Sequence, residues 1–405
     1  MQSMKYLFLI IFVVLASCSD RVKSKQRAKH TCSTLSAGDI RKNIKCLSDT
    51  SVSYTLYLPK GHKAGVSLSP VLFFFDAHQR GVLPVKKYKE LADRYGIIFV
   101  GSNSSENGQQ PGLSKKIVRT TINDVKNRLN VDKKNILVAG FSGGARVAVS
   151  AALTGAFGIR GVIGCAAGFP NVQSLAGMNF RWVGVVGNRD FNYLELVNVN
   201  RQLKSSGFDS HLLVFDGKHE WPPVEVVDES LEILFGGKAR EFVEDPASRQ
   251  WENKEIEGRQ FLANAMKSKD LSWWNEKIAT LENSSRQAAS ESERLMNARL
   301  LSFMSMVSFM YANSAIQQNR PEAAKKYLTI YEKVDSENPD VYFLRAEYSM
   351  LTGNDKEALT MLEKSAQLGY ADREKLLTDR FFTNLKRKAP FKNIIEKVTE
   401  NKEKE

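Results

Sequence analysis

The sequence lacks long low-complexity blocks, and beyond its first residues it lacks any apolar run long enough to cross a membrane. It also lacks zinc-finger, helix-turn-helix and aromatic–basic strand motifs, so we expect no nucleic-acid partner. What is present is typical of globular protein, with 42% hydrophobic and 25% charged residues. A chain of 405 residues is too long for one ordinary core and predicts two domains. We interpret the net charge of +13 as a solvated basic surface, with binding to anionic lipid or acidic polysaccharide as the alternative.

The first residues have the pattern of an export signal. Lys5 precedes an apolar run, Tyr6 to Leu15, that is too short to span a bilayer. The run ends in Leu-Ala-Ser-Cys at residues 15–18, which resembles the lipobox of bacterial lipoproteins. The resemblance implies cleavage before Cys18, a lipid anchor on Cys18, and export to the bacterial cell envelope on its periplasmic or cell-surface side. A plain secretory signal is the alternative.

Cysteine is scarce, and export would place the four copies in an oxidising compartment. With Cys18 acylated, three remain, so at least one has no disulfide partner within the chain. Cys32 and Cys46 flank a short stretch before the first expected strand, and whether they pair stays open. Cys165 lies in an apolar run and is expected to be a buried thiol.

Composition divides the chain into four parts: a signal peptide over residues 1–17, a polar tether over 18–50, and two domains. Residues 51–236 alternate short apolar runs with amphipathic stretches. This alternation predicts an α/β fold with a mostly parallel sheet and helices on both faces. The expected strands are Ser53–Leu58, Pro70–Phe75, Ile97–Ser102, Ile136–Phe141, Gly161–Ala166, Trp182–Gly187 and His211–Phe215. The expected helices are Lys86–Tyr95, Lys115–Leu129, Gly144–Leu153, Leu194–Ser206 and Val224–Leu234.

Residues 237–405 are poor in glycine and proline and predict an all-α domain. Within it, the pentapeptide at 319–323 recurs at 354–358, a spacing of 35 residues. This pattern resembles tetratricopeptide repeats, whose period is about 34 residues. The extra residue is expected in the turn near Asn338-Pro339. The resemblance implies a surface that binds a protein partner.

One motif suggests a nucleophile. Gly140-Phe141-Ser142-Gly143-Gly144 follows an expected strand and opens an expected helix. This is the G-x-S-x-G pattern of a nucleophile elbow, in which the serine occupies a tight, strained turn. The turn leaves the Ser142 hydroxyl at a helix N-terminus, where the helix dipole favours negative charge. The alternative is a glycine-containing turn with an idle serine.

A serine hydroxyl needs a base, and the chain contains only five histidines. His219 follows the last expected strand, on the loop where the fold needs its base. Asp190 follows the preceding strand and is the expected acid that holds the imidazole in one tautomer. Asp216 is the rival acid and is expected instead to cap the loop. The chain order Ser142, Asp190, His219 is that of α/β-hydrolases.

The loop from Gly217 to Pro222, together with the elbow, resembles secreted esterases of the polyhydroxybutyrate-depolymerase and feruloyl-esterase type. The resemblance implies an oxyanion hole made by the Gly143 N–H and a second N–H from the loop after an earlier strand. In that loop His78 matches the family's His-Gly pattern, whereas Gln79 departs from the glycine. The second donor therefore stays open between Gln79 and Arg80, and His78 is expected to hold the loop by hydrogen bonds.

The predicted function is a serine hydrolase that cleaves a carboxylic ester through an acyl-enzyme, without metal or organic cofactor. The resemblance favours an ester substrate, such as an acyl-decorated polysaccharide. Two alternatives stay open: a serine peptidase of prolyl-oligopeptidase-like type, and a non-catalytic adaptor that binds a protein partner through its repeats. Short connections between strands leave no room for a large lid, which predicts an open cleft. The candidate pocket residues are His78, Asn103 and Trp221.

Overall fold

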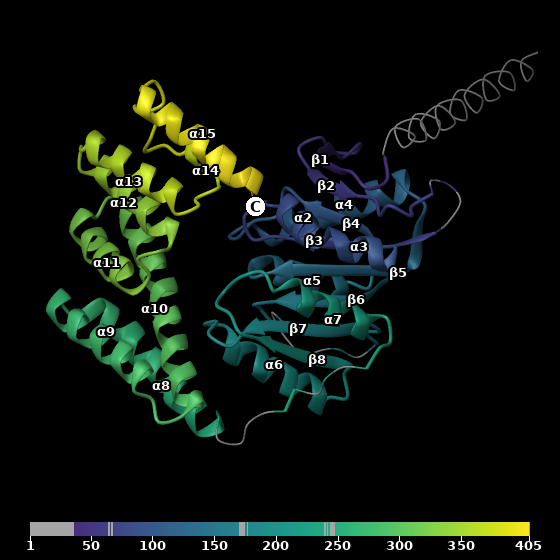
Figure 1. Cartoon of the computed structure of the whole chain (residues 1–405), viewed down its shortest axis with the longest axis horizontal. Coiled ribbons are helices and arrows are strands. Elements are labelled where there is room, and N and C mark those ends of the chain that lie inside the picture. The colour runs from purple at the N-terminus through teal and green to yellow at the C-terminus, as the bar shows by residue number, and fades with distance from the viewer. Residues whose placement is uncertain are drawn as a thin grey trace, which may run out of the picture. The chain divides into compact units, whose positions relative to one another are not determined.

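The computed structural model of the chain describes residues 36–404 apart from 64, 66, 67, 170–174, 176, 239, 241 and 244–247 (Figure 1). The expected signal peptide, the lipidation site Cys18, and Cys32 lie outside these residues. The chain divides into two compact units. The first unit comprises Met1–Val183, Leu203–Ser210 and Val227–Lys238, and the second comprises Gly184–Gln202, His211–Val226 and Ala239–Glu405.

The described strands form one eight-stranded sheet in the order β1-β2-β4-β3-β5-β6-β7-β8. Strands β3, β4, β5 and β6 pair in parallel, whereas β1 with β2 and β2 with β4 pair antiparallel. Each residue of β2 and β4 is buried, as a sheet covered on both faces requires. The expected mostly parallel sheet is therefore confirmed. Its strands are β1 (Ile40–Lys45), β2 (Ser53–Tyr57), β3 (Ser69–Phe75), β4 (Ile98–Ser102), β5 (Val131–Phe141), β6 (Ile159–Cys165), β7 (Arg181–Gly187) and β8 (Ser210–Phe215).

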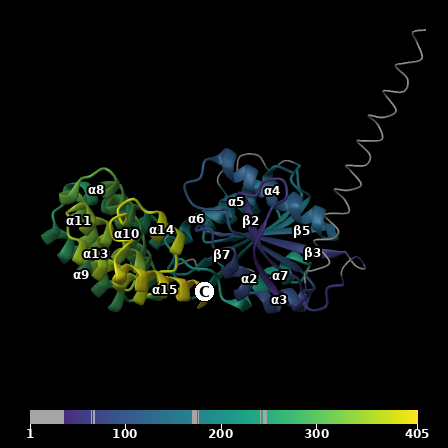
Figure 2. The same cartoon turned by 90° about the horizontal axis from the view of Figure 1, so that it is seen from above.

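Helices cover both faces of the sheet, as expected. Figure 2 shows α4 and α5 on one face and α2, α3 and α7 on the other. The helix expected at 86–95 is in fact two short helices separated at Tyr88. Among the described residues no helix is both long enough and apolar enough to cross a membrane. The helices are α2 (Val82–Lys87), α3 (Lys89–Tyr95), α4 (Pro111–Arg128), α5 (Gly143–Leu153), α6 (Tyr193–Ser205) and α7 (Val224–Leu234).

Strand β1 lies within the stretch that the sequence assigned to the tether. Only Ile40 and Ile44 of its six residues are partly buried, while the residues between them are exposed. Such a weak apolar pattern does not stand out in a polar segment, although it suffices for an edge strand that pairs on one side. Nearby, Cys46 is a buried free thiol, and burial and the Asp124 carboxylate raise its pKa to about 12. Cys165 is also a buried free thiol, as the sequence led us to expect.

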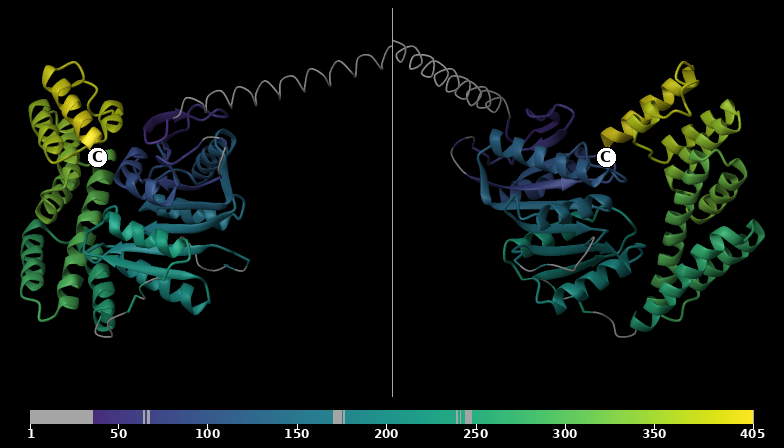
Figure 3. Two further views of the ribbon diagram at one scale, coloured as in Figure 1. Left: turned by 45° about the vertical axis from the view of Figure 1, so that its right-hand side comes forward. Right: turned by 180° about the vertical axis from the view of Figure 1, so that it is seen from behind.

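The C-terminal part of the second unit is helical, green to yellow in Figure 3. The long helix α10 packs against α8, α9 and α11, and α12 packs against α13. Buried aromatic side chains, among them Trp274 and Phe382, fill the spaces between helices. The expected all-α character of this region is confirmed. Its helices are α8 (Ser248–Ser268), α9 (Leu271–Arg286), α10 (Glu291–Gln317), α11 (Pro321–Val334), α12 (Pro339–Leu351), α13 (Asp355–Gln367), α14 (Arg373–Thr378) and α15 (Ala389–Lys404).

Two helices of the region, α11 and α13, have a spacing that differs from the expected 35 residues. Helices α11 and α13 begin at Pro321 and Asp355, 34 residues apart. The fully buried small residues of the two helices, Ala324 and Ala358, keep the same spacing, as do the buried Leu328 and Leu362. The expected partner of Ala358, Ala323, is only partly buried. The alignment of identical residues in the sequence was therefore wrong by one residue. Identical residues in two helices need not occupy the same buried face.

The second unit also buries an acidic pair. Glu347 of α12 and Asp379 are almost fully buried, and Lys375 Nζ lies 3.6 Å from Glu347 Oε1 and 2.6 Å from Asp379 Oδ2. Burial, together with the neighbouring Asp379 carboxyl, raises the pKa of Glu347 to about 9. Glu347 is therefore protonated in the folded chain at neutral pH, whereas in the unfolded chain it ionises.

This difference predicts a pH-dependent stability. Because the folded state keeps a proton that the unfolded state loses, the free energy of unfolding should fall as pH rises from about 4.5 to 9. The slope from this group approaches about 1.4 kcal/mol per pH unit. Glu347→Gln cannot ionise, so it should remove this part of the decline. Thermal unfolding of the full chain at pH 5 and pH 8 measures it.

The control is Glu363→Gln, at an exposed position of α13. It should keep the wild-type difference between the two pH values. Equal differences for the Glu347 and Glu363 variants would show that Glu347 holds no extra proton in the folded state.

Candidate active site

Ser142 lies at the turn from β5 to α5, in an unusual backbone conformation. Its φ of 54° and ψ of −121° are rare for a residue with a side chain. The turn is held on both sides: the Ser142 N–H donates to the Cys165 carbonyl at 2.9 Å, and the Ala145 N–H donates to the Ser142 carbonyl at 3.0 Å. The helix therefore starts directly after the serine, and the side chain stands at its N-terminus.

The glycine two residues after Ser142 allows this tight approach of helix and sheet. A Cβ at Gly144 would lie 1.9 Å from the carbonyl oxygen of Phe75, at the end of the neighbouring strand β3. At that distance the backbone of α5 or of β3 would have to shift, so glycine is needed at this position. The last glycine of the G-x-S-x-G pattern is thus explained by close packing at the carboxyl ends of β3 and β5.

The loop after β3 was expected to supply the second oxyanion donor. Gln79 has a positive φ of 60°, and its N–H donates to the Ser105 carbonyl at 2.9 Å. That N–H is therefore already bonded inside the fold, which makes Gln79 the weaker candidate for the donor. The Arg80 side chain binds the buried Asp76 through its Nε at 3.0 Å. The His78 N–H donates to the same carboxylate at 2.8 Å.

The candidate pocket residues differ in environment. The side-chain oxygen of Asn103 accepts from the Thr55 hydroxyl at 3.1 Å, and its amide nitrogen donates to Asn43 at 3.2 Å. Asn103, directly after β4, therefore contacts side chains of both β2 and β1. Trp221 is buried, with 5% of its surface exposed, whereas the His78 side chain is half exposed.

The structure brings His219 and Asp190 together. His219 Nδ1 lies 3.0 Å from both carboxylate oxygens of Asp190, whose surface is fully buried. The Asn192 N–H donates to Asp190 Oδ1 at 2.7 Å. With its oxygens occupied in this way, the carboxylate orients the imidazole so that Nε2 is directed away from it. Phe191 stacks on the imidazole with ring centroids 4.3 Å apart, a contact that the sequence analysis missed.

The loops that carry the pair are joined to each other through their main chains. The Asn188 N–H donates to the Phe215 carbonyl at 2.8 Å, and the Arg189 N–H donates to the Gly217 carbonyl at 3.0 Å. A Cβ at Gly187 would lie 2.5 Å from the Gly217 carbonyl oxygen, so only glycine permits this approach. The acid loop, residues 187–190, and the base loop, residues 216–219, are therefore held against each other by main-chain hydrogen bonds.

The rival acid has a different partner. The Asp216 side chain is 75% exposed, and its Oδ1 lies 3.3 Å from Arg189 Nη2. A screened surface pair of this kind contributes little to stability. Asp216 thus belongs to the surface of the base loop, while the buried Asp190 is the carboxylate that contacts the imidazole. Ser142 belongs to the first unit, and both Asp190 and His219 belong to the second.

The first unit contains a cavity of about 390 Å³ between α4 and α5 that sequence analysis did not predict. Its walls are mostly apolar, and basic side chains from both helices line it. The residues that define it include Lys115, Val118, Arg119, Arg146, Val147 and Phe157. Across the described parts of the chain, no group of three His, Cys, Asp or Glu residues could hold a metal ion.

No protein-family model and no curated protein matches the sequence. Solved structures that resemble the chain include three enzymes. One is a feruloyl esterase module from Clostridium thermocellum, with 12% identity over 52% of this chain and 92% of that one and a TM-score of 0.41. Another is an S-formylglutathione hydrolase from Staphylococcus aureus, with 13% identity, coverage of 49% and 96%, and a TM-score of 0.39. The third, an esterase from Rhizomucor miehei, has 15% identity, coverage of 52% and 87%, and a TM-score of 0.39.

The backbone of Ser142 predicts an unusual order of stabilities. Strain at such a conformation amounts to about 1–3 kcal/mol, and glycine relieves it at an entropic cost of about 0.5–1 kcal/mol. Ser142→Gly should therefore be more stable than Ser142→Ala by about 1 kcal/mol. Urea unfolding of the two variants measures the difference, and both variants lack the hydroxyl.

Ser150, in the middle of α5, provides the matched comparison. There alanine should be more stable than glycine by about 1 kcal/mol, as in any helix interior. If alanine were the more stable residue at both positions, the turn at Ser142 would carry no strain.

Proposed function

We propose that the chain is a serine hydrolase of esterase type, with Ser142 as nucleophile, His219 as base and Asp190 as the supporting acid. The observation that carries this proposal is Ser142 itself, a residue with a side chain held at a φ of 54° between a buried strand and a helix N-terminus. Strained backbone conformations cluster at active sites and ligand-binding sites. The His219–Asp190 pair supports the proposal, because an oriented imidazole is what the serine needs.

The proposed reaction is acyl transfer in two halves. His219 accepts the proton of Ser142 as the hydroxyl attacks the ester carbonyl, and Asp190 stabilises the imidazolium that forms. The oxyanion is held by main-chain N–H groups, for which Gly143 and Arg80 are the candidates; each such donor contributes about 3 kcal/mol. His219 then protonates the departing alcohol, and water repeats the sequence on the acyl-enzyme.

The substrate class and location form part of the same proposal. A carboxylic ester, such as an acyl group on an extracellular polysaccharide, suits the expected open cleft. The lipobox-like stretch ending at Cys18 supports export and a lipid anchor in the cell envelope. The helical repeats suit a protein partner.

A fluorophosphonate probe tests the nucleophile. Because such probes react with activated serines, wild type should be labelled and Ser142→Ala should not. Ser150→Ala, eight residues further along the chain and within α5, should label as wild type does. Labelling is read by gel fluorescence and by mass spectrometry of the modified peptide.

Hydrolysis of a small panel of acetyl, feruloyl and longer-chain esters then defines the acyl group. Equal labelling of wild type and Ser142→Ala, or labelling of neither, would contradict the proposal and favour a non-catalytic adaptor. Cleavage of peptide substrates but of no ester in the panel would identify a peptidase instead.

A further inference from the structure

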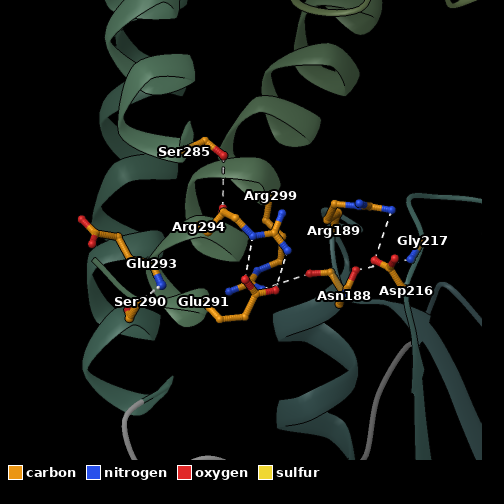
Figure 4. Close-up of polar contacts among 10 residues, drawn as sticks. All are labelled: Asn188, Arg189, Asp216, Gly217, Ser285, Ser290, Glu291, Glu293, Arg294 and Arg299. Carbon is orange, nitrogen blue, oxygen red and sulfur yellow. Dashed lines mark hydrogen bonds and ion pairs between the residues drawn. The ribbon is translucent and has the colours of Figure 1, made fainter. Parts of the chain in front are cut away.

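One side chain of the helical region reaches the acid loop. Arg299 of α10 is buried, and its Nη1 donates to the main-chain carbonyl of Asn188 at 3.1 Å (Figure 4). Its Nε donates to Glu255 of α8 at 2.8 Å. The guanidinium also lies over the ring of Tyr193, 4.4 Å from the centroid. Three contacts thus fix the guanidinium of Arg299, and one of them is with the loop that carries Asp190.

Asn188 is the residue where three segments meet. Its carbonyl oxygen accepts from Arg299, and its N–H donates to the carbonyl of Phe215. Its side-chain oxygen accepts from the N–H of Gly217 at 3.3 Å, in the base loop. Asp190 follows two residues later, so a shift of the Asn188 peptide moves the carboxylate that binds His219. Figure 4 shows Asn188 between Arg299 and Gly217.

Stability alone is a weak reason for this arrangement. Glu255 is fully buried, and a buried ion pair often contributes no more than apolar side chains of the same size. Glu255 also receives a hydrogen bond from Arg259, one turn further along α8. The ion pair instead orients the guanidinium. An arginine whose Nε is bonded to a carboxylate holds its remaining N–H groups in fixed directions.

We infer that Arg299 is a positioning residue for the Asp190–His219 pair. By fixing the carbonyl of Asn188, it holds the acid loop where its carboxylate meets the imidazole, and Glu255 keeps Arg299 in place. The helical region is thereby part of the machinery that orients the base. The consequence for catalysis rests on the proposed function, whereas the effect on the pair itself does not.

The kinetic test is Arg299→Gln in the full chain, with the ester that wild type hydrolyses best. We expect kcat to fall about tenfold with KM nearly unchanged, because small misplacement of a catalytic group costs up to about 100-fold in rate. In an Asp190→Asn background the same substitution should cause almost no further loss, since residues that act as one unit are not additive. A full tenfold loss in that background would overturn the inference.

The matched control is Arg201→Gln. Arg201 of α6 pairs with Glu252 of α8, with Nη1 at 3.0 Å from Oε2, so it joins α6 to the same helical region within the second unit. Its kcat should stay within twofold of wild type. An equal loss in the two variants would indicate a general loosening rather than a role for Arg299.

A second measurement does not depend on activity. The Nδ1 proton of His219 should give a downfield ¹H NMR signal while the carboxylate holds it, and Asp190→Asn assigns that signal. We expect Arg299→Gln to broaden or abolish it and Arg201→Gln to retain it. A folded Arg299→Gln chain with the wild-type signal would overturn the inference. Failure of the labelling experiment would instead remove only the proposed function.

Arg299→Lys is a second variant in case Arg299→Gln fails to fold. It keeps a positive charge beside Glu255. A compact ammonium group on a flexible stem does not reproduce the fork that also reaches Asn188. The folded lysine variant should therefore still show a lower kcat than wild type and a broadened or absent His219 NMR signal. Wild-type values for both would show that charge alone suffices and that Arg299 does not position the loop.

Discussion

Burial of the Asp190 carboxylate is the constraint on which much of the second unit depends. A carboxylate removed from water is unstable unless donors surround it. Here the donors are the imidazole of His219 and the N–H of Asn192, and each has to be held in place. The first is held by a loop bonded through its main chain to the acid loop, and the second by the start of α6. The buried Asp190 carboxylate therefore requires the base loop and the start of α6 to lie close to it.

The first unit is organised by a constraint of another kind, which is backbone strain. The conformation of Ser142 persists because β5 pairs in parallel with strands on both sides and α5 packs directly against the sheet. Phe75 opposes Gly140 and Phe141 opposes Cys165, so the end of β5 has little freedom to relax. Rigid neighbours let a turn keep a conformation that it would not adopt alone.

The order of strands and helices could be predicted because it depends on local patterns of apolar residues in the sequence. The exceptions have physical reasons. Strand β1 buries only parts of Ile40 and Ile44, too little to stand out in a polar segment. The repeat register depends on which face of a helix Ala324 and Ala358 occupy, which matching letters do not reveal. The Gln79 N–H is used by Ser105, a partner 26 residues away that only the folded loop brings near.

The contact between Arg299 and Asn188 joins positions 111 residues apart, and no local pattern predicts it. It also means that the loop after β7 leaves the ribosome long before α10, the helix whose arginine contacts it. Until the last third of the chain is made, this loop lacks one of its neighbours. A fragment ending at the glycine pair 236–237, where composition suggests a boundary, would keep all the sheet strands yet leave the Asn188 carbonyl without its donor. A boundary at residues 236–237 would therefore divide the acid loop from the arginine that bonds to it.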